Sequence, residues 1–376
     1  MLKDPIQKLF ALCAHIEQTD QIHLHLLDAV RQITQWEDVP IQAEEHGMAP
    51  LLNYHLRKSG VKIHTEVQRD LTGLALRHRL INQVRTRILS EMTSIFNQSE
   101  VPFFVLKGAA LAHMLYPNPD LRPMKDMDIL IKPEHIDLVT DLLKQLGYQQ
   151  KPDSFLHPSE LHLPTFTRQE EGFHISVEVH HRLLPENSKK FWGYLDKFSL
   201  PPFNFSISKD TQVKTLSKEE FLYHLCKHTF FSYHVLEPIR MIWVADICNF
   251  SEKFVDDIDW KFVKNHFPLV QHTLAALHEI LPLSTHLLTS GEIHPRINPE
   301  KVISTYQGWP GVPLRDVKKQ DYWRWFKDTC FPSGWVIFLH YGNGRFKAKW
   351  YNWLKHVMNL VAITKQHMKI RLNTKI

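Results

Sequence analysis

Two aspartates separated by one residue give the sequence its clearest chemical signal. Asp126 and Asp128 lie in the segment KDMDILI. Because side chains alternate along a strand, both carboxylates are predicted to lie on one face. Two like charges side by side are unfavourable unless a divalent cation lies between them, and carboxylate oxygens are what Mg²⁺ takes when substrate phosphates complete its shell. The pair therefore predicts a metal site. Since MDILI is strongly apolar, a surface turn is the less favoured interpretation.

A third carboxylate is predicted on the polar face of a later strand. In FHISVEVHH, residues 173–181, apolar residues alternate with polar ones, and Glu178 is among the polar ones. The preceding LPTFTRQ and the turn residues EEG predict a hairpin that returns this strand beside its neighbour. An ordinary exposed strand residue is the alternative for Glu178. His180 and His181 next to it are expected to tune the carboxylates rather than bind a metal directly.

The segment before the aspartates predicts a strand, a glycine turn and a helix. VPFFVL is a short run of β-forming residues, Lys107, Gly108 and Ala109 follow it, and a helical pattern extends over 110–116. Backbone N–H groups and the helix dipole at such a position favour phosphate. Most glycines at strand ends are only turns, so this signal gains weight from the Asp-x-Asp motif downstream.

These motifs together resemble a known family. The string LKGAALAHMLYPNPDLRPMKDMDILI is similar to the bacterial uncharacterised nucleotidyltransferase family, a branch of the DNA polymerase β-like superfamily. The resemblance extends from about residue 36 to about residue 250, with its motifs between 107 and 182. The resemblance implies a set of site residues: Asp126, Asp128 and Glu178 as the catalytic and metal-binding triad, and Lys107, Gly108, Ala109 and Arg122 as the nucleotide-binding group. Ala109 departs from the usual Gly or Ser and offers no hydroxyl to a phosphate.

The resemblance also implies an activity. The expected enzyme is a metal-dependent nucleotidyltransferase, with Mg²⁺ or Mn²⁺ as cofactor, that moves a nucleoside monophosphate from a nucleoside triphosphate to an acceptor. ATP is the expected donor, and the acceptor would be a hydroxyl or similar group on a small molecule, peptide or protein. Nucleic acid is a less favoured acceptor. Two alternatives stay open: a toxin-like, antitoxin-like or regulatory binding protein that retains the fold, and nucleotide addition to RNA ends.

The elements that must position these residues indicate an α+β protein. We expect a small mixed β-sheet nucleotidyltransferase core flanked by N-terminal and C-terminal helical regions. Prolines and serines in LPPFNFSISKDTQVKTLS predict a linker over 199–217, followed by two helices up to residue 250. The expected domains are an N-terminal helical region over 1–98, the α/β core over 99–205, a helical region over 206–300 and an aromatic-rich basic region over 301–376.

In the N-terminal region, a helix face recurs at Ile81, Val84 and Ile88, and its arginines, Arg85 among them, are expected mainly on other faces toward solvent. His224 and His228 share a helical face at a spacing that can bind zinc, but no glutamate completes a zinc motif, so a structural role is expected.

Composition sets the remaining limits. The chain has 376 residues and 43% hydrophobic content, enough for a sizeable core, and its four cysteines are scattered without a CxxC pair. No stretch is long and apolar enough to predict a membrane span, so a cytoplasmic location is expected.

The net charge of +5 comes from the C-terminal end, since residues 329–376 hold eight Lys and Arg and no Asp or Glu. A basic tail could meet an anionic partner, although a solvated helix face is the commoner explanation. Trp350, Trp353, Leu354, Val357 and Val361 are predicted to form one apolar helix face that packs on the protein.

Overall fold

The computed structural model describes residues 5–150, 161–183, 200–231, 240–278, 280–294, 323, 330, 350–358 and 360–361. The chain divides into two compact units. One consists of Gln35–Phe221, and the other combines Met1–Thr34 with Leu222–Ile376. The first unit contains every residue that the sequence predicted for the site.

A mixed five-stranded sheet forms the centre of the first unit, in the order β1-β2-β5-β4-β3. Its strands are β1 (Phe103–Val105), β2 (Met127–Ile131), β3 (Gln149–Gln150), β4 (Phe166–Glu170) and β5 (Phe173–His180). Neighbouring strands run antiparallel except β2 and β5, which are parallel. The predicted hairpin is formed by β4 and β5, with Gly172 at φ +80° in its turn, a conformation that glycine adopts without strain. The α+β fold class with a small mixed sheet is confirmed.

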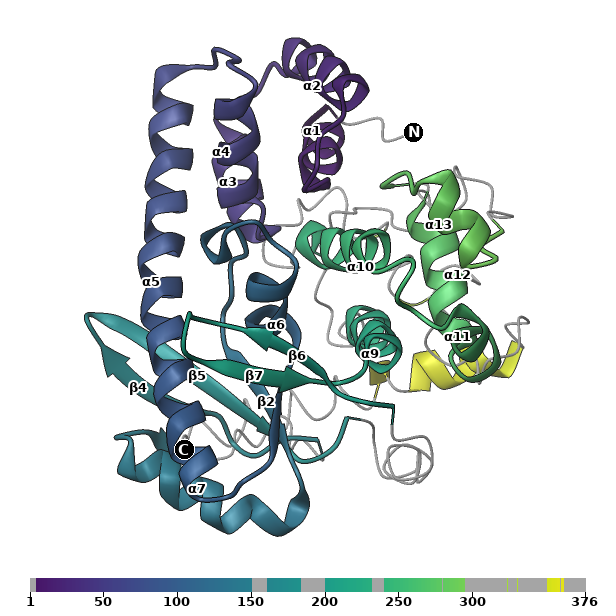
Figure 1. Ribbon diagram of the computed structural model, residues 1–376. Helices are drawn as coiled ribbons and strands as arrows, with labels where there is room; N and C mark the ends of the chain where they lie inside the picture. The colour runs from purple at the N-terminus through teal and green to yellow at the C-terminus, as the bar shows by residue number, and fades with distance from the viewer. Residues whose placement is uncertain are drawn as a thin grey trace. The chain divides into compact units, whose positions relative to one another are not determined.

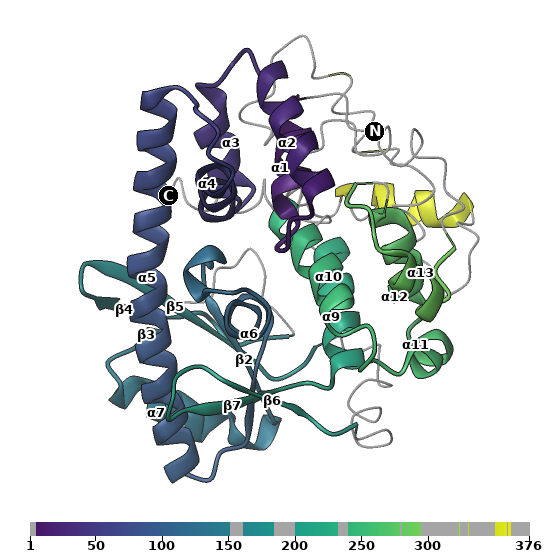
Figure 2. The same ribbon diagram turned by 45° about the horizontal axis from the view of Figure 1, so that its top comes forward.

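Helices surround this sheet within the same unit. They are α3 (Asp38–Glu45), α4 (Ala49–Lys58), α5 (Thr65–Gln98), α6 (Lys107–Met114) and α7 (Ile136–Gln145), with the short 3₁₀ turns η1 (Pro119–Leu121) and η2 (Pro133–His135). The long helix α5 passes beside the sheet and continues along α3 and α4 (Figure 1). Helix α6 packs on β2 (Figure 2). Gly47 separates α3 from α4 at φ +66°.

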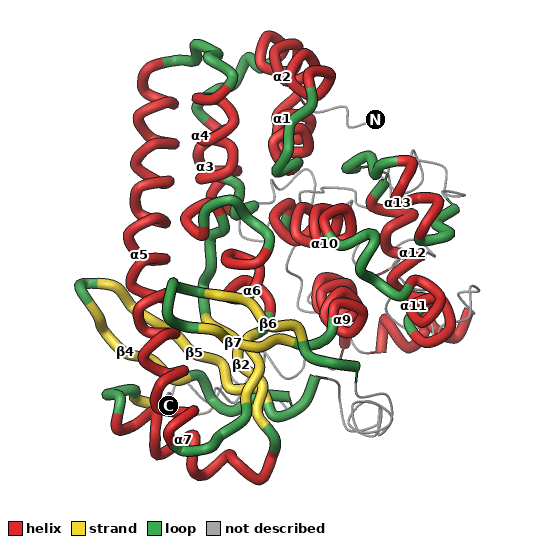
Figure 3. Tube along the Cα trace, viewed as in Figure 1, coloured by secondary structure: helices red, strands yellow, loops and turns green. Residues whose placement is uncertain are grey.

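The segment expected to be a linker contains a second, two-stranded sheet. Strands β6 (Phe203–Ser206) and β7 (Gln212–Thr215) pair antiparallel (Figure 3). Strand β7 also contacts β1 of the large sheet. The segment predicted as a linker over 199–217 therefore contains regular structure. Phe205 and Val213 are buried opposite each other in the hairpin, and this apolar alternation decides the structure over the neighbouring prolines and serines.

One face of α5 departs from prediction. Val84 and Ile88 are buried as expected, but Arg85 is only 3% exposed and Asn82 is fully buried beside them. The prediction that the arginines of this helix face solvent was therefore wrong for Arg85, whereas Arg77 and Arg87 are exposed. Two polar side chains on a buried helix face need hydrogen-bond partners, and they find them in the segment that leads to β2.

The second unit is helical wherever it is described. Its helices are α1 (Pro5–Ala14), α2 (Asp20–Gln32), α9 (Lys218–Phe231, which begins in the first unit), α10 (Met241–Lys253), α11 (Trp260–His266), α12 (Pro268–Leu277) and α13 (Thr285–Ser290). Helix α1 packs against both α2 and α10. Asn249 of α10 joins them by accepting from the Ile16 N–H at 3.0 Å and donating to the Ala14 carbonyl at 2.8 Å. Within the described residues, no helix is long and apolar enough to cross a membrane.

Residues 350–358 and 360–361 are helical, as predicted, but they do not bury the predicted face. Trp350, Leu354 and Val361 are 77%, 53% and 48% exposed, while Asn352 and His356 are buried. The expected apolar face was therefore wrong: periodicity locates a stripe on a helix, whereas the packing neighbours decide which stripe is covered. The basic residues after 361 lie outside the described residues.

Candidate active site

The parallel pairing of β2 and β5 brings two predicted carboxylates to the same level of the sheet. Asp128 and Glu178 are Cα partners in this register, and Met127 is paired with Val177. Because neighbouring strands in register present the same face at the same level, the side chains of Asp128 and Glu178 lie next to each other. Two acids that are far apart in the sequence are thus brought side by side on adjacent strands.

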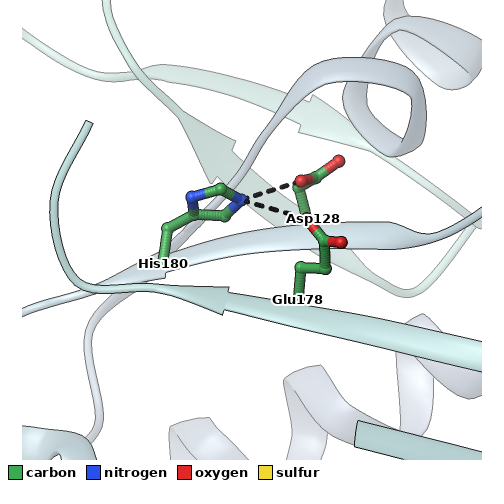
Figure 4. A group of neighbouring side chains, drawn as sticks. All are labelled: Asp128, Glu178 and His180. Atoms are coloured by element: carbon green, nitrogen blue, oxygen red, sulfur yellow. Dashed lines mark hydrogen bonds and ion pairs between the residues drawn. The ribbon is translucent and has the colours of Figure 1, made fainter. Parts of the chain in front are cut away.

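His180 completes a compact group with these two acids (Figure 4). One ligand atom from each of Asp128, Glu178 and His180 lies within 4.8 Å of the other two. The Nε2 atom of His180 is 2.8 Å from Asp128 Oδ1 and 3.7 Å from Glu178 Oε2. Since a carboxylate only accepts hydrogen bonds, Nε2 carries the proton in this arrangement.

Lys107 supplies a positive charge to the same carboxylate. Its Nζ donates to Asp128 Oδ1 at 2.7 Å, and both side chains are largely buried. The backbone of Lys107 has φ +46°, a left-handed conformation that a non-glycine residue adopts at a cost of about 1 kcal/mol or more. This conformation occurs where β1 ends and α6 begins, and the surrounding packing must hold it there.

The charges of the group are strongly coupled. Burial alone would raise the pKa of Asp128, but the Lys107 ammonium and the hydrogen bond from His180 bring it well below its ordinary value. Burial opposes the charged form of Lys107 too, and the carboxylates of Asp128 and Glu178 outweigh it and raise the lysine's pKa. Burial, followed by the charge of Lys107, lowers the pKa of His180 to about 4, so its imidazole is neutral at pH 7.

Negative charge in the group exceeds what Lys107 compensates. Burial and then the charges of Asp128 and Asp126 raise the pKa of Glu178 to about 8. Burial and the charge of Asp128 also raise the pKa of Asp126. In both acids, the protein therefore disfavours the ionised form relative to water.

The donor set fits a divalent cation. Asp128 and Glu178 offer the hard carboxylate oxygens that divalent cations prefer. Asp128 already binds one positive group, the ammonium of Lys107. An imidazole in the group suits Mn²⁺ better than Mg²⁺, which prefers all-oxygen coordination. For His180 to bind a cation through Nε2, its proton must move to Nδ1.

Gly108 lies against the guanidinium group of Arg122. A Cβ atom at Gly108 would be 3.0 Å from one Arg122 terminal nitrogen and 3.1 Å from Met124 Cγ, so any side chain here would require these two neighbours to shift by a few tenths of an ångström. Arg122 itself is buried and donates to the Pro123 carbonyl. Gly108 and Ala109 belong to the first turn of α6 rather than to a separate turn.

Helix α5 holds the segment that carries Arg122 and leads to Asp126. The Asn82 Nδ2 atom donates to the carbonyls of Pro119 and Arg122 at 3.0 and 2.9 Å. Arg85 donates to the Lys125 carbonyl at 2.9 Å, and its charge lies within electrostatic reach of Asp126. Burial lowers the pKa of Arg85 to about 10, which still leaves the guanidinium charged at pH 7.

The predicted residues thus fall into three groups. Asp128, Glu178 and Lys107 lie together, and Asp126 precedes β2 within reach of their charges but outside the compact group, so its role as a metal ligand stays a prediction. Gly108 and Ala109 lie in the first turn of the neighbouring helix α6, and the guanidinium group of Arg122 packs against Gly108.

The sequence did not predict that His180 contacts the carboxylates directly, nor that Asn82 and Arg85 are buried. Alternation along β5 places His180 on the face of Glu178, which is a signal for the former. No comparable signal marks Asn82 and Arg85.

Comparison with known proteins adds two similarities. The sequence model of the family described as "Uncharacterised nucleotidyltransferase" matches residues 32–287. A crystal structure of an antigenic nucleotidyltransferase-like protein from Paracoccidioides brasiliensis is similar at 17% sequence identity and a TM-score of 0.37, covering 58% of this chain and 96% of that one. No curated protein matches the sequence.

Proposed function

The chain belongs to the uncharacterised nucleotidyltransferase family, and from this premise we propose that it transfers a nucleoside monophosphate from a nucleoside triphosphate to an acceptor hydroxyl. The acceptor would be a small molecule, a peptide or a protein, and ATP is the donor we favour. The main support for this proposal is that Asp128 and Glu178 are paired in register on adjacent strands. The side chains of His180 and Lys107 contact Asp128 there.

Asp128, Glu178 and His180 would hold the divalent cation, with Asp126 as the further carboxylate that the resemblance predicts. A bound cation would neutralise charge on the triphosphate and lower the pKa of the acceptor hydroxyl. Mn²⁺ and Mg²⁺ are the two candidates, and the imidazole favours Mn²⁺.

The protein's own residues would supply orientation and charge. Lys107 lies at the start of α6, where its Nζ atom contacts Asp128, and it would pair with a phosphate oxygen once a cation shares Asp128. Arg122, placed against Gly108, would neutralise charge on the departing pyrophosphate. Glu178 has the more exposed carboxylate of the strand pair and would accept the proton of the acceptor hydroxyl.

The reaction would form a bond between the acceptor oxygen and the α-phosphorus and break the bond from that phosphorus to the bridging oxygen of pyrophosphate. Positioning and electrostatic stabilisation account for most of the rate enhancement in reactions of this type. The acidic group and the two cationic side chains, Lys107 and Arg122, would supply electrostatic stabilisation. Hydrogen bonds from α5 to the segment that leads to β2 would supply positioning.

The test is to incubate the protein with each of four α-labelled nucleoside triphosphates, Mg²⁺ or Mn²⁺, and a cell extract. We expect one or more extract molecules to take up label, and Asp128→Asn to reduce uptake by on the order of 10³-fold. Exposed Asp137→Asn is the matched control and should label as the wild type does. Equal labelling by wild type and Asp128→Asn would refute the proposed role of the site.

A further inference from the structure

A cleft in the unit that contains the sheet lies between α4, α5 and the turn at η1. Its volume is about 530 Å³, which is in the range of clefts that accommodate small organic ligands. Tyr54 and Arg57 line it from α4, Leu76 and Arg79 from α5, and Asp120 from the turn. None of the residues assigned to nucleotidyl transfer lines this cleft.

Positive charge prevails in the lining. Arg57, Lys58 and Arg79 face a single acid, Asp120, whose Oδ2 atom is 3.5 Å from Arg79 Nε. Arg57 has no acidic partner among the residues that the structure describes. Lys58 lies 5.6 Å from the centre of the Tyr54 ring and leaves its ammonium group available to an anion. An oxyanion would find more cationic groups here than the protein itself neutralises.

Apolar surface lies beside these charges. Leu76 is 52% exposed, and together with Ala75 and the ring of Tyr54 it gives the cleft an apolar wall. An exposed leucine that lines a cleft can pack against an apolar or aromatic group of a ligand.

A polar donor lies at the cleft as well. Asn53 is only 8% exposed, and its Oδ1 atom accepts from Gln68 Nε2 at 2.9 Å and from Thr72 Oγ1 at 3.4 Å. Its Nδ2 donor has no partner among the described residues and is not enclosed by the protein. Because Asn53 lines the cleft, this donor is open to an acceptor atom of a ligand.

We propose that this cleft binds a small molecule that carries an oxyanion, either a phosphate or a carboxylate, next to an apolar or aromatic part. Arg57 and Arg79 bind the oxyanion, Asn53 donates to a polar group of the ligand, and Leu76 and Tyr54 contact its apolar part. The site is independent of nucleotidyl transfer at Asp128, so either proposal can fail without the other.

The cleft borders the segment that α5 clamps. Asp120 is within η1, whose first residue, Pro119, is held by Asn82 through its carbonyl, and the same amide holds Arg122. A ligand in the cleft would therefore contact a turn that is fastened to the same α5 residue as Arg122.

The test is isothermal titration calorimetry of the full chain with four probes: phenyl phosphate, benzoate, inorganic phosphate and benzyl alcohol. Phenyl phosphate or benzoate should bind, and which of them binds tighter identifies the oxyanion. Inorganic phosphate should bind at least about tenfold more weakly than the preferred aromatic anion, because it leaves the apolar wall uncovered. Benzyl alcohol, which has no charge, should not bind measurably.

Variants locate the binding. Arg57→Gln combined with Arg79→Gln should weaken the preferred anion at least about tenfold. The control combines Arg69→Gln with Lys144→Gln, which removes the same charge from exposed positions outside the cleft, and should leave affinity unchanged. The proposal is overturned if neither aromatic anion binds the wild type, if the cleft variant binds as well as the wild type, or if the control loses as much affinity as the cleft variant.

Discussion

Among single residues, Asp128 belongs to the proposed metal site and also holds buried charge together, because it accepts from both Lys107 and His180. Repulsion between Asp126 and Asp128 would by itself make the loss of either carboxylate harmless to stability. The structure instead shows Asp128 accepting from Lys107 and His180. Removing Asp128 therefore leaves a largely buried ammonium group without its closest counter-charge, and such a group is costly.

We accordingly predict that Lys107 and Asp128 are energetically coupled. Asp128→Asn should destabilise the protein by about 3 kcal/mol, and Asp128→Asn on a Lys107→Met background by at least about 1 kcal/mol less. Urea denaturation of the wild type, both single variants and the double variant measures this coupling. Additive effects of the two changes would contradict the ion pair.

Glu178 gives a pH-dependent prediction for the metal-free protein. Its folded pKa of about 8 lies above its ordinary 4.5, so folding disfavours the ionised form. The wild type should therefore lose stability relative to Glu178→Gln as pH rises from about 4.5 to about 8, by on the order of 1.4 kcal/mol for each unit of pKa shift. Denaturation with EDTA at several pH values across this window measures the difference.

Glu170 provides the control for that series. The hydrogen bond with Arg87 lowers the pKa of Glu170 below its ordinary 4.5. The stability that ionised Glu170 contributes is therefore fully present at any pH above about 4.5. Glu170→Gln should change stability by the same amount at every pH from about 5 to 8. A Glu178→Gln difference that is equally flat would show that Glu178 does not carry the raised pKa.

At the scale of elements, α5 determines the position of the segment between α6 and β2. We predict that Arg85→Met destabilises the protein by about 2 kcal/mol, because the Lys125 carbonyl loses its charged donor, which is itself buried. The same change should reduce nucleotidyl transfer by displacing Asp126. Arg87→Met is the control on the same helix, since that side chain is 50% exposed, and it should change stability far less than Arg85→Met does. Equal losses in the two variants would contradict the clamp.

Individual elements explain how much of this arrangement could be predicted. Alternation in β5 and the apolar run of β2 identify both strands, because a period of two leaves a clear pattern. The parallel register that pairs Asp128 with Glu178 depends on contacts between distant segments and has no local signal. Arg85 was missed for a related reason: the groups that favour its burial include the Lys125 carbonyl and the Asp126 charge, which are distant in the sequence.

At the scale of the whole molecule, a cation that binds the folded site must stabilise the unit that contains it. Adding Mn²⁺ at about 100 times its dissociation constant should stabilise the wild type by about 2.7 kcal/mol. The shift should disappear in Asp128→Asn and shrink in His180→Ala. If thermal unfolding resolves the two units, only the transition of Gln35–Phe221 should move. An equal shift in Asp128→Asn would place the cation elsewhere.

Two reactions with differently labelled triphosphates distinguish transfer of the nucleotidyl group from transfer of the terminal phosphate. One reaction contains the triphosphate labelled at the α-phosphorus, the other the same triphosphate labelled at the γ-phosphorus, each with Mn²⁺ and the acceptor fraction identified by labelling. The account predicts α-label in the acceptor and γ-label in released pyrophosphate, with both signals lost in Asp128→Asn. Transfer of the γ-label to the acceptor, or an acceptor that takes up neither label, would contradict it.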